Sequence, residues 1–293
     1  FAHPVGDAKD FLSIGSYYWP DPKKKNGVPW IKRDGFTNPD SWRDWKLINF
    51  MADTVRILSL AYYFSGNEKY AEGASAHLRA WFVDKNTSMN PNCQYGKVIP
   101  GVRNGGYAVA GFGYVFRQVY DAAGILEASS SWTASDRKGF RDWTRRFLLW
   151  SLKSKYGREE RRANNNHGTF YDMISALQGL YLDNKPWAIR QLKHFKYIRM
   201  KRQFASDGSQ PFEMRRTDNY DYHRVNLMIS FDMAQMADRF PYLDIWNHET
   251  SKGGSLKKSV NFLLPYLTGK KPWPFFKKKK FEITEYERWR LLH

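Results

Sequence analysis

The residues best suited to chemistry lie in two short segments, residues 161–172 and 211–222. The first contains three asparagines in a row, ending at Asn166, followed directly by His167 and Gly168. Asn competes for backbone hydrogen bonds and Gly costs backbone entropy, so we expect these residues to precede a helix rather than form one. The helical pattern of residues 170–182 then places polar side chains at a helix entrance, where free N–H groups favour anions. A capping loop with a surface histidine explains the segment equally well.

The side chains of these segments could together bind an acidic group and move a proton. The Asn166 amide can donate a hydrogen bond, and His167 can donate or act as a base, because a histidine has a reference pKa of about 6.5. Arg216 can bind a carboxylate through two parallel hydrogen bonds. Tyr222 carries a phenol that neighbouring cations would favour in its ionised form. An arginine and a tyrosine six residues apart are, on their own, usually structural.

Composition favours an acidic partner. The net charge of +18, from 47 basic and 29 acidic residues, attracts polyanions. The chain has no helix-turn-helix, zinc-finger or RNA-binding signature, so we expect no nucleic-acid partner. It has no stretch of about 20 apolar residues, so we expect no membrane span. Aromatic residues make up 17% of the chain and could stack on sugar rings, although an aromatic-rich core is an equal explanation.

Neither metal nor cofactor is expected from the sequence. The seven histidines lack HxxxH and HExxH spacing, there is no cysteine cluster, and no Gly-rich phosphate loop is present. Cys93 is the single cysteine, which excludes an intrachain disulfide. The chain begins at Phe1, and we expect a secreted or periplasmic monomer from which a signal peptide has been removed.

The elements that must position these side chains are mostly helices. Apolar residues recur every three or four positions from Trp45 to Tyr62, and again from Tyr70 to Trp81, with Gly66 and Asn67 ending the first helix. Further helices are expected at about 107–127, 135–155, 169–182, 187–203, 223–239 and 254–267, with Ser135 and Asp136 suited to a helix start. Residues 84–106 form a long irregular loop, which in a compact domain is usually functional.

The pattern therefore predicts an all-α protein. Roughly eight helices, paired as antiparallel hairpins, follow an irregular N-terminal segment, 1–42, and precede a basic tail, 269–293, that we expect to be solvated. We expect one catalytic domain over residues 1–293. Amphipathic hairpins in series can close into an (α/α) toroid whose loops line a cleft, but the periodicity alone supports only the all-α class.

Four segments resemble the alginate lyase superfamily, polysaccharide lyases that cleave polyuronates, and they occur in the family's order. They are residues 10–22, which include Tyr-Tyr-Trp-Pro-Asp-Pro; residues 89–101, with Met-Asn-Pro-Asn and Ile-Pro-Gly; Asn-Asn-His-Gly-Thr-Phe-Tyr-Asp at 165–172; and residues 211–222. The ordered set is far more specific than any one motif. The resemblance implies an incomplete (α/α) barrel that acts without a metal.

The resemblance also assigns roles to individual residues. It implies that Asn166, His167, Arg216 and Tyr222 are catalytic, with Arg215 and Tyr220 as alternatives for the last two. The candidate substrate-binding residues are Tyr17, Tyr18, Trp19, Asn92, Lys97, Arg103, Asn165 and Arg215. Two positions depart from the family pattern, because Lys97 stands where a glutamine is common and Asn164 adds a third asparagine.

Cleaving a polyuronate by β-elimination requires three functions. The carboxylate next to C5 must be neutralised by fixed donors, a base must take the C5 proton, and an acid must protonate O4. In β-D-mannuronate and β-D-glucuronate the proton and O4 leave from the same side, so Tyr222 could perform both transfers. In α-L-guluronate they are anti, and His167 would be the more natural base. We therefore expect polymannuronate or polyglucuronate as substrate, with 4,5-unsaturated products.

Two other functions remain open from the sequence. A glycoside hydrolase needs two well-placed carboxylates, and Asp172, Glu213, Asp218 and Asp221 are available. A non-catalytic protein that binds an acidic polysaccharide would keep the basic charge without needing Tyr222.

Overall fold

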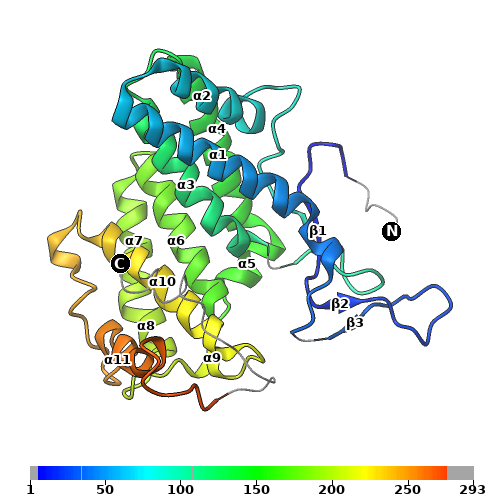
Figure 1. Ribbon diagram of the computed structural model, residues 1–293, viewed down its shortest axis with the longest axis vertical. Helices are drawn as coiled ribbons and strands as arrows, with labels where there is room; N and C mark the ends of the chain where they lie inside the picture. The colour runs from blue at the N-terminus through cyan, green and yellow to red at the C-terminus, as the bar shows by residue number, and fades with distance from the viewer. Residues whose placement is uncertain (1–5, 34, 107, 276–293) are drawn as a thin grey trace. The chain divides into compact units, whose positions relative to one another are not determined.

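The computed structural model describes residues 6–33, 35–106 and 108–275 and divides into two compact units. Unit 1 comprises residues 1–161 and 177–185, and unit 2 comprises residues 162–176 and 186–293. Helices dominate the described parts of both units, and the strands there are only two to four residues long, which confirms the predicted all-α class (Figure 1). That residues 1–293 act as one catalytic domain stays a prediction.

Unit 1 begins its helical part with the predicted hairpin. Helix α1 (Arg43–Ser65) ends at Gly66, which adopts a left-handed conformation with φ 67°. Asn67 then caps α2 (Glu68–Phe82), its side-chain oxygen accepting the Lys69 N–H at 3.1 Å. The helix stop predicted at Gly66 and Asn67 is therefore confirmed, and α1 packs on both α2 and α3 (Phe112–Leu126) (Figure 1).

The next helix differs from its predicted bounds. Helix α4 (Ala134–Lys153) starts one residue early, because Thr133 forms a capping box with Asp136. It also ends early, at Ser154, whose backbone is extended, and a separate short helix α5 (Lys155–Arg161) follows. The single helix predicted over 135–155 is thus two, since apolar spacing carries no mark of a one-residue break.

An aromatic cluster forms the core of unit 1. The rings of Trp45, Phe112, Phe116, Trp143 and Phe147 are buried, and neighbouring ring centroids lie 5.0–5.9 Å apart. Much of the high aromatic content is therefore core.

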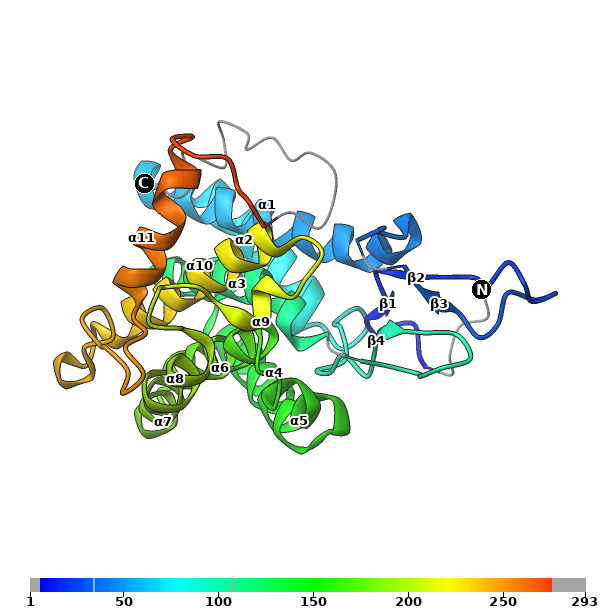
Figure 2. The ribbon, with the colours of Figure 1, turned by 90° about the horizontal axis from the view of Figure 1, so that it is seen from below.

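The irregular segments of unit 1 carry two short ladders. Strand β1 (Leu12–Ile14) pairs in parallel with β4 (Tyr95–Val98), and β2 (Tyr18–Trp19) pairs antiparallel with β3 (Ile31–Lys32) (Figure 2). Single 3-10 turns, η1 (Pro39–Trp42) and η2 (Val109–Gly111), precede α1 and α3. Strands this short leave no detectable alternation in the sequence, which explains why none was predicted.

Unit 2 contains the four candidate catalytic residues and most of the helices that position them. In chain order they are α6 (Asn166–Tyr181, in unit 2 up to residue 176), α7 (Lys185–His194, in unit 2 from residue 186), the π-helical turn η3 (Phe195–Arg199), α8 (Met200–Gln203), α9 (Pro211–Met214), α10 (Asn219–Ala237), η4 (Pro241–Leu243) and α11 (Leu256–Leu267). Helix α10 contacts α9 and α11 (Figure 2). The segments α7, η3 and α8 run on without a break over the predicted helix 187–203.

Two helix starts in unit 2 differ from the prediction and matter for the site. Helix α6 begins at Asn166, so the expectation that Asn166, His167 and Gly168 lie outside the helix is wrong. Helix α10 begins at Asn219, four residues before the predicted start, and this places Tyr222 in its first turn.

The chain after α11 returns to the core of unit 2. Trp273 is buried among Tyr220, His223 and Phe262, and its indole N–H donates to the side-chain oxygen of Asn219 at 2.8 Å. The expectation of a solvated tail is thus wrong at this tryptophan, and the rest of the predicted basic tail, 276–293, lies outside the described residues.

Candidate active site

The entrance of α6 is built by the asparagines that precede it. The side-chain oxygen of Asn165 accepts the His167 N–H at 3.3 Å, and its carbonyl accepts the Gly168 N–H at 2.9 Å. Asn165 is therefore the N-cap of α6. This leaves Asn166 and His167 on the first turn, the first buried and the second half-buried. Substrate binding by Asn165 stays a prediction.

Gly168 is required by a close approach of an arginine. A Cβ atom at this position would lie 2.1 Å from Nη1 of Arg199 and 2.2 Å from the carbonyl oxygen of Ala163. The same Nη1 donates to that carbonyl at 2.6 Å, and Nε and Nη2 donate to the Asp172 carboxylate at 2.8 and 2.9 Å. The Arg199–Asp172 pair thus ties the loop before α6 to the helix itself, across the position that only glycine fits.

Glu213 on α9 holds the candidate catalytic asparagine. Its Oε1 accepts the backbone N–H of Asn166 at 2.5 Å, and its Oε2 accepts the Asn166 side-chain N–H at 2.7 Å. Burial raises the pKa of Glu213 to about 7, although the hydrogen bonds from Asn166 and the charge of Arg216 act to lower it. From the sequence alone, Glu213 is only a candidate carboxylate for hydrolysis.

The candidate arginine and tyrosine are in direct contact. Nη2 of Arg216 donates to the Tyr222 hydroxyl at 3.0 Å, and the guanidinium carbon lies 3.9 Å from the centre of the tyrosine ring. Both side chains are half-buried. The turn between α9 and α10, together with the first turn of α10, brings them together, so that the phenol oxygen has a guanidinium as its hydrogen-bond donor.

The two alternative residues lie elsewhere. Arg215 is exposed, with its guanidinium carbon 5.2 Å from the ring of Phe212. Tyr220 is fully buried against Trp273, with ring centroids 5.2 Å apart. The geometry therefore favours Arg216 and Tyr222 over the alternatives, and their catalytic roles belong to the proposal below.

Three of the four carboxylates that a hydrolase could use are already engaged. Asp172 is buried and receives two hydrogen bonds from Arg199. His194 Nδ1 also lies 3.0 Å from Oδ2 of Asp172. Glu213 receives both Asn166 donors, and Asp221 pairs with Arg224 at 2.8 Å. None of these three is presented as an exposed acid, which weakens the hydrolase alternative.

The candidate substrate-binding residues of unit 1 have structural partners. Tyr18 and Trp19 form strand β2, and Tyr17 directly precedes it. The Trp19 indole N–H donates to the Phe36 carbonyl at 2.9 Å. The side-chain oxygen of Asn92 accepts the Gln94 N–H at 2.9 Å. Arg103 pairs with Glu159 at 2.8 Å. These contacts leave their role in substrate binding a prediction.

Lys97 lines a cavity of unit 1. This pocket of unit 1 has a volume of about 660 Å³, and aromatic side chains share its lining with Lys97, among them Trp42, Phe50 and Tyr114. Trp42 and Phe50 are 47% and 69% exposed. Exposed rings beside a cation suit an acidic sugar, because the rings can stack on the sugar face while the ammonium binds its carboxylate. Sequence reasoning missed these three rings, whose only signal was the high aromatic content.

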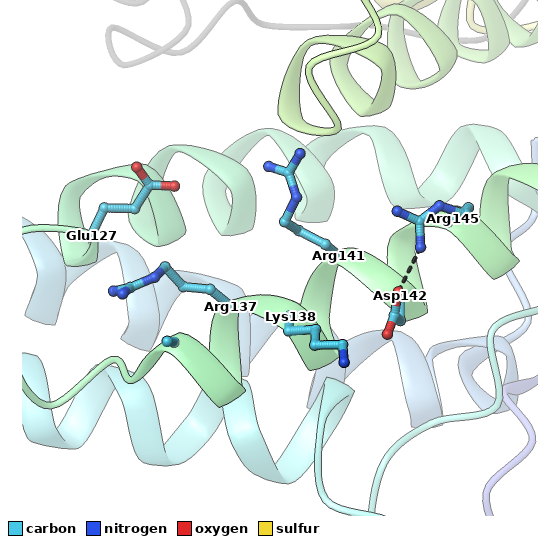
Figure 3. A pocket seen from close by; sticks show the side chains of 7 residues that line it. Glu127, Arg137, Lys138, Arg141, Asp142 and Arg145 are labelled. Carbon is cyan, nitrogen blue, oxygen red and sulfur yellow. Dashed lines mark hydrogen bonds and ion pairs between the residues drawn. The ribbon is translucent and has the colours of Figure 1, made fainter.

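A second pocket of unit 1, of about 480 Å³, is basic, and two of the four cations that line it are ion-paired (Figure 3). Arg145 pairs with Asp142 at 2.5 Å, and Arg141 pairs with Asp183 at 2.6 Å. Arg137 donates to the Trp132 carbonyl. No candidate residue from the sequence lines this pocket.

Over residues 6–33, 35–106 and 108–275, no helix is long and apolar enough to cross a membrane. In the same described ranges, no group of three or more His, Cys, Asp or Glu side chains could hold a metal ion.

The described residues form a mainly helical fold with an Asn–His pair at a helix entrance and an arginine on a half-buried tyrosine, and the family that matches this sequence makes the protein a polysaccharide lyase. The chain belongs to the alginate lyase family, whose sequence model matches residues 2–273. A search of curated proteins gave no match.

Solved structures show the same fold. An alginate lyase from Bacteroides ovatus is 34% identical, with a TM-score of 0.89 over 98% of this chain and 76% of that one. Alginate lyase A1-III from Sphingomonas species A1 is 14% identical, with a TM-score of 0.64 over 92% of this chain and 69% of that one. A histidine-to-alanine variant of A1-III, complexed with a tetrasaccharide, matches with 15% identity and a TM-score of 0.63 over 92% and 68%. The predicted (α/α) toroid class is thereby confirmed.

Proposed function

We propose that this lyase cleaves a β-1,4-linked polyuronate, either the polymannuronate of alginate or polyglucuronate, by β-elimination. The observation that carries the proposal is the contact between Arg216 and the half-buried Tyr222 hydroxyl. Through this contact the phenol oxygen, in the first turn of α10, has a cation beside it. Asn166 and His167, in the first turn of α6, supply further donors.

The chemistry begins with the uronate carboxylate. Asn166, His167 and Arg216 donate to it, so that negative charge developing at C5 is stabilised where it forms. The Tyr222 phenolate then removes the C5 proton, the bond from C4 to O4 breaks, and the same hydroxyl returns a proton to O4. The products are a new chain end at O4 and a uronate with a C4–C5 double bond.

The stereochemistry selects the substrate class. One oxygen can serve both transfers only when the C5 proton and O4 leave from the same side, as in β-D-mannuronate and β-D-glucuronate. With α-L-guluronate, His167 acts as the base instead. In unit 1, the pocket that Lys97 shares with Trp42 and Tyr114 offers a binding position of its own for an acidic sugar.

The test is a panel of polymannuronate, polyguluronate, polyglucuronate and glycosaminoglycans, followed by the ultraviolet absorbance of the C4–C5 double bond. We expect absorbance to rise with polymannuronate or polyglucuronate. Reducing sugar released without absorbance would support the hydrolase, and binding without any cleavage would support the polyanion-binding protein. Export from the cytoplasm and a monomeric state stay predictions.

A further inference from the structure

Glu213 is a buried carboxylate that the proposed elimination does not use. It is 1% exposed, yet its two oxygens accept the backbone N–H and one of the two side-chain N–H bonds of Asn166, at 2.5 and 2.7 Å. Its backbone carbonyl also accepts the N–H of Arg216 at 3.0 Å. One residue therefore contacts the side-chain amide of Asn166 and the backbone of Arg216, two residues proposed to neutralise the substrate carboxylate.

This contact fixes the orientation of the Asn166 amide. An ionised carboxylate can only accept hydrogen bonds, so the nitrogen of the amide must face it. Rotating the amide by half a turn would place its oxygen against Oε2 of Glu213, replacing a charge-assisted hydrogen bond with repulsion. The second bond, from the backbone N–H, holds the start of α6 against α9 and keeps the amide at a constant distance.

We propose that Glu213 is a positioning residue of the lyase reaction, which acts through Asn166 and Arg216 and not as an acid or base. Its carboxylate keeps the Asn166 amide in one orientation, so that the remaining donor is ready for the uronate carboxylate. Its carbonyl holds the Arg216 backbone beside the same site. The kinetic part of this inference rests on the proposed function.

The hold on Asn166 requires the ionised form of Glu213. Burial raises the pKa of this carboxyl to about 7, and among its charged neighbours Arg216 acts to lower it. Two other carboxylates on the packed helices are compensated, Asp172 of α6 by Arg199 and Asp221 of α10 by Arg224. A protonated carboxyl loses part of its capacity to accept, so the positioning is complete above this pKa and weakens as pH falls through it.

The first experiment replaces Glu213 with Gln, which has nearly the same shape. A glutamine has one acceptor oxygen for two donors, so the Asn166 amide loses its fixed orientation. We expect kcat to fall about 10²-fold with little change in KM, because small misplacements of a catalytic group cost this much. The acid limb that Glu213 contributes to the pH profile of kcat should also disappear.

Two controls separate positioning from a general loss of structure. Asp136→Asn alters another buried carboxylate, in unit 1, that accepts the Thr133 N–H at 3.0 Å, and should lower Tm while leaving kcat and its pH profile unchanged. In an Asn166→Ala background, adding Glu213→Gln should lower kcat by less than about 2-fold, because the effects of residues that act as a unit are not additive.

The second experiment needs no activity. In protein labelled with ¹⁵N-asparagine, the Asn166 side-chain amide signal, assigned by its loss in Asn166→Ala, should shift with a midpoint near pH 7 and should not do so in Glu213→Gln. An amide signal that does not titrate in the wild type, or an unchanged kcat and pH profile in Glu213→Gln, overturns the proposal. If Glu213→Gln does not fold, the wild-type titration alone decides. A titrating amide in a protein that cleaves no polyuronate overturns the proposed function instead, and supports the hold of Glu213 on Asn166.

Discussion

Replacing Tyr222 with Phe removes a single oxygen from the site. That oxygen accepts a hydrogen bond from Arg216 at 3.0 Å, while the ring beneath the guanidinium, at 3.9 Å, is retained. A hydrogen bond to a charged group contributes about 1.5–3 kcal/mol, and the half-buried setting favours the lower end of this range. The variant should therefore stay folded.

The expected loss of activity is much larger. General acid and general base catalysis each contribute roughly 10²–10⁴-fold, and Tyr222 is proposed to supply both. We expect kcat to fall by at least about 10⁴-fold, equivalent to about 5 kcal/mol of transition-state stabilisation. Binding of an oligosaccharide should change little, because Asn166, His167 and Arg216 remain.

The assay is the initial rate of double-bond formation at saturating polymannuronate or polyglucuronate, with thermal melts and calorimetric binding of an oligosaccharide. Tyr220→Phe is the matched control, since it makes the same chemical change two residues away in the buried core. Its turnover should stay near that of the wild type. Near-wild-type turnover in Tyr222→Phe would refute the assignment, and loss in Tyr220→Phe instead would move the catalytic tyrosine by two residues.

Four further outcomes follow from the site and the fold. Turnover should persist in EDTA. If EDTA abolishes turnover and Ca²⁺ restores it, the side chains do not neutralise the substrate carboxylate alone. KM should rise with salt, because exposed charges are screened over a Debye length of about 8 Å at physiological ionic strength, whereas a flat response would place the +18 charge away from the substrate path. Gly168→Ala should lower stability by about 1–3 kcal/mol through its clash with Arg199, while Gly124→Ala, with no atom within 4 Å of the added carbon, should be stabilising by about 0.5–1 kcal/mol in urea melts. Burial lowers the pKa of His223 to about 3. The neutral side chain therefore contributes stability above pH 6.5, and on the order of 5 kcal/mol of it is lost as pH falls toward 3. Acid unfolding of His223→Gln should lack this loss.

The helical hairpins were predictable because local signals determine them. Apolar spacing every three or four residues and the Gly66–Asn67 stop place α1 and α2 correctly. The start of α6 was not predictable from the sequence, because Asn and Gly have low helix propensity and the residues that stabilise this helix start are distant in sequence. Glu213 accepts the first N–H of the helix, and Arg199 holds its approach loop. Tertiary contacts override propensity at this position.

The site was predictable only in part, for the same reason. The family resemblance selects Arg216 and Tyr222, but their contact depends on α9 and on an α10 that begins at Asn219, neither of which the periodicity indicates. The aromatic side chains beside Lys97 come from α1, its preceding turn and α3, and nothing in their spacing marks them as neighbours. What a carboxylate does here depends on its partner, which the sequence does not show for Glu213.

The engagement of the acidic side chains explains how a site can bind a polyanion while containing carboxylates. Unpaired carboxylates near Arg216 would repel a uronate and would compete for the donors that must neutralise it. In unit 2, Asp172 binds Arg199, Asp221 binds Arg224, and Glu213 binds two donors of Asn166. Each of these three carboxylates thus orders a donor or is covered by a cation, and the Arg216 guanidinium keeps its contact with the Tyr222 hydroxyl. Such an arrangement suits elimination, which needs oriented donors and one proton-transferring oxygen, better than hydrolysis, which needs two accessible carboxyl groups.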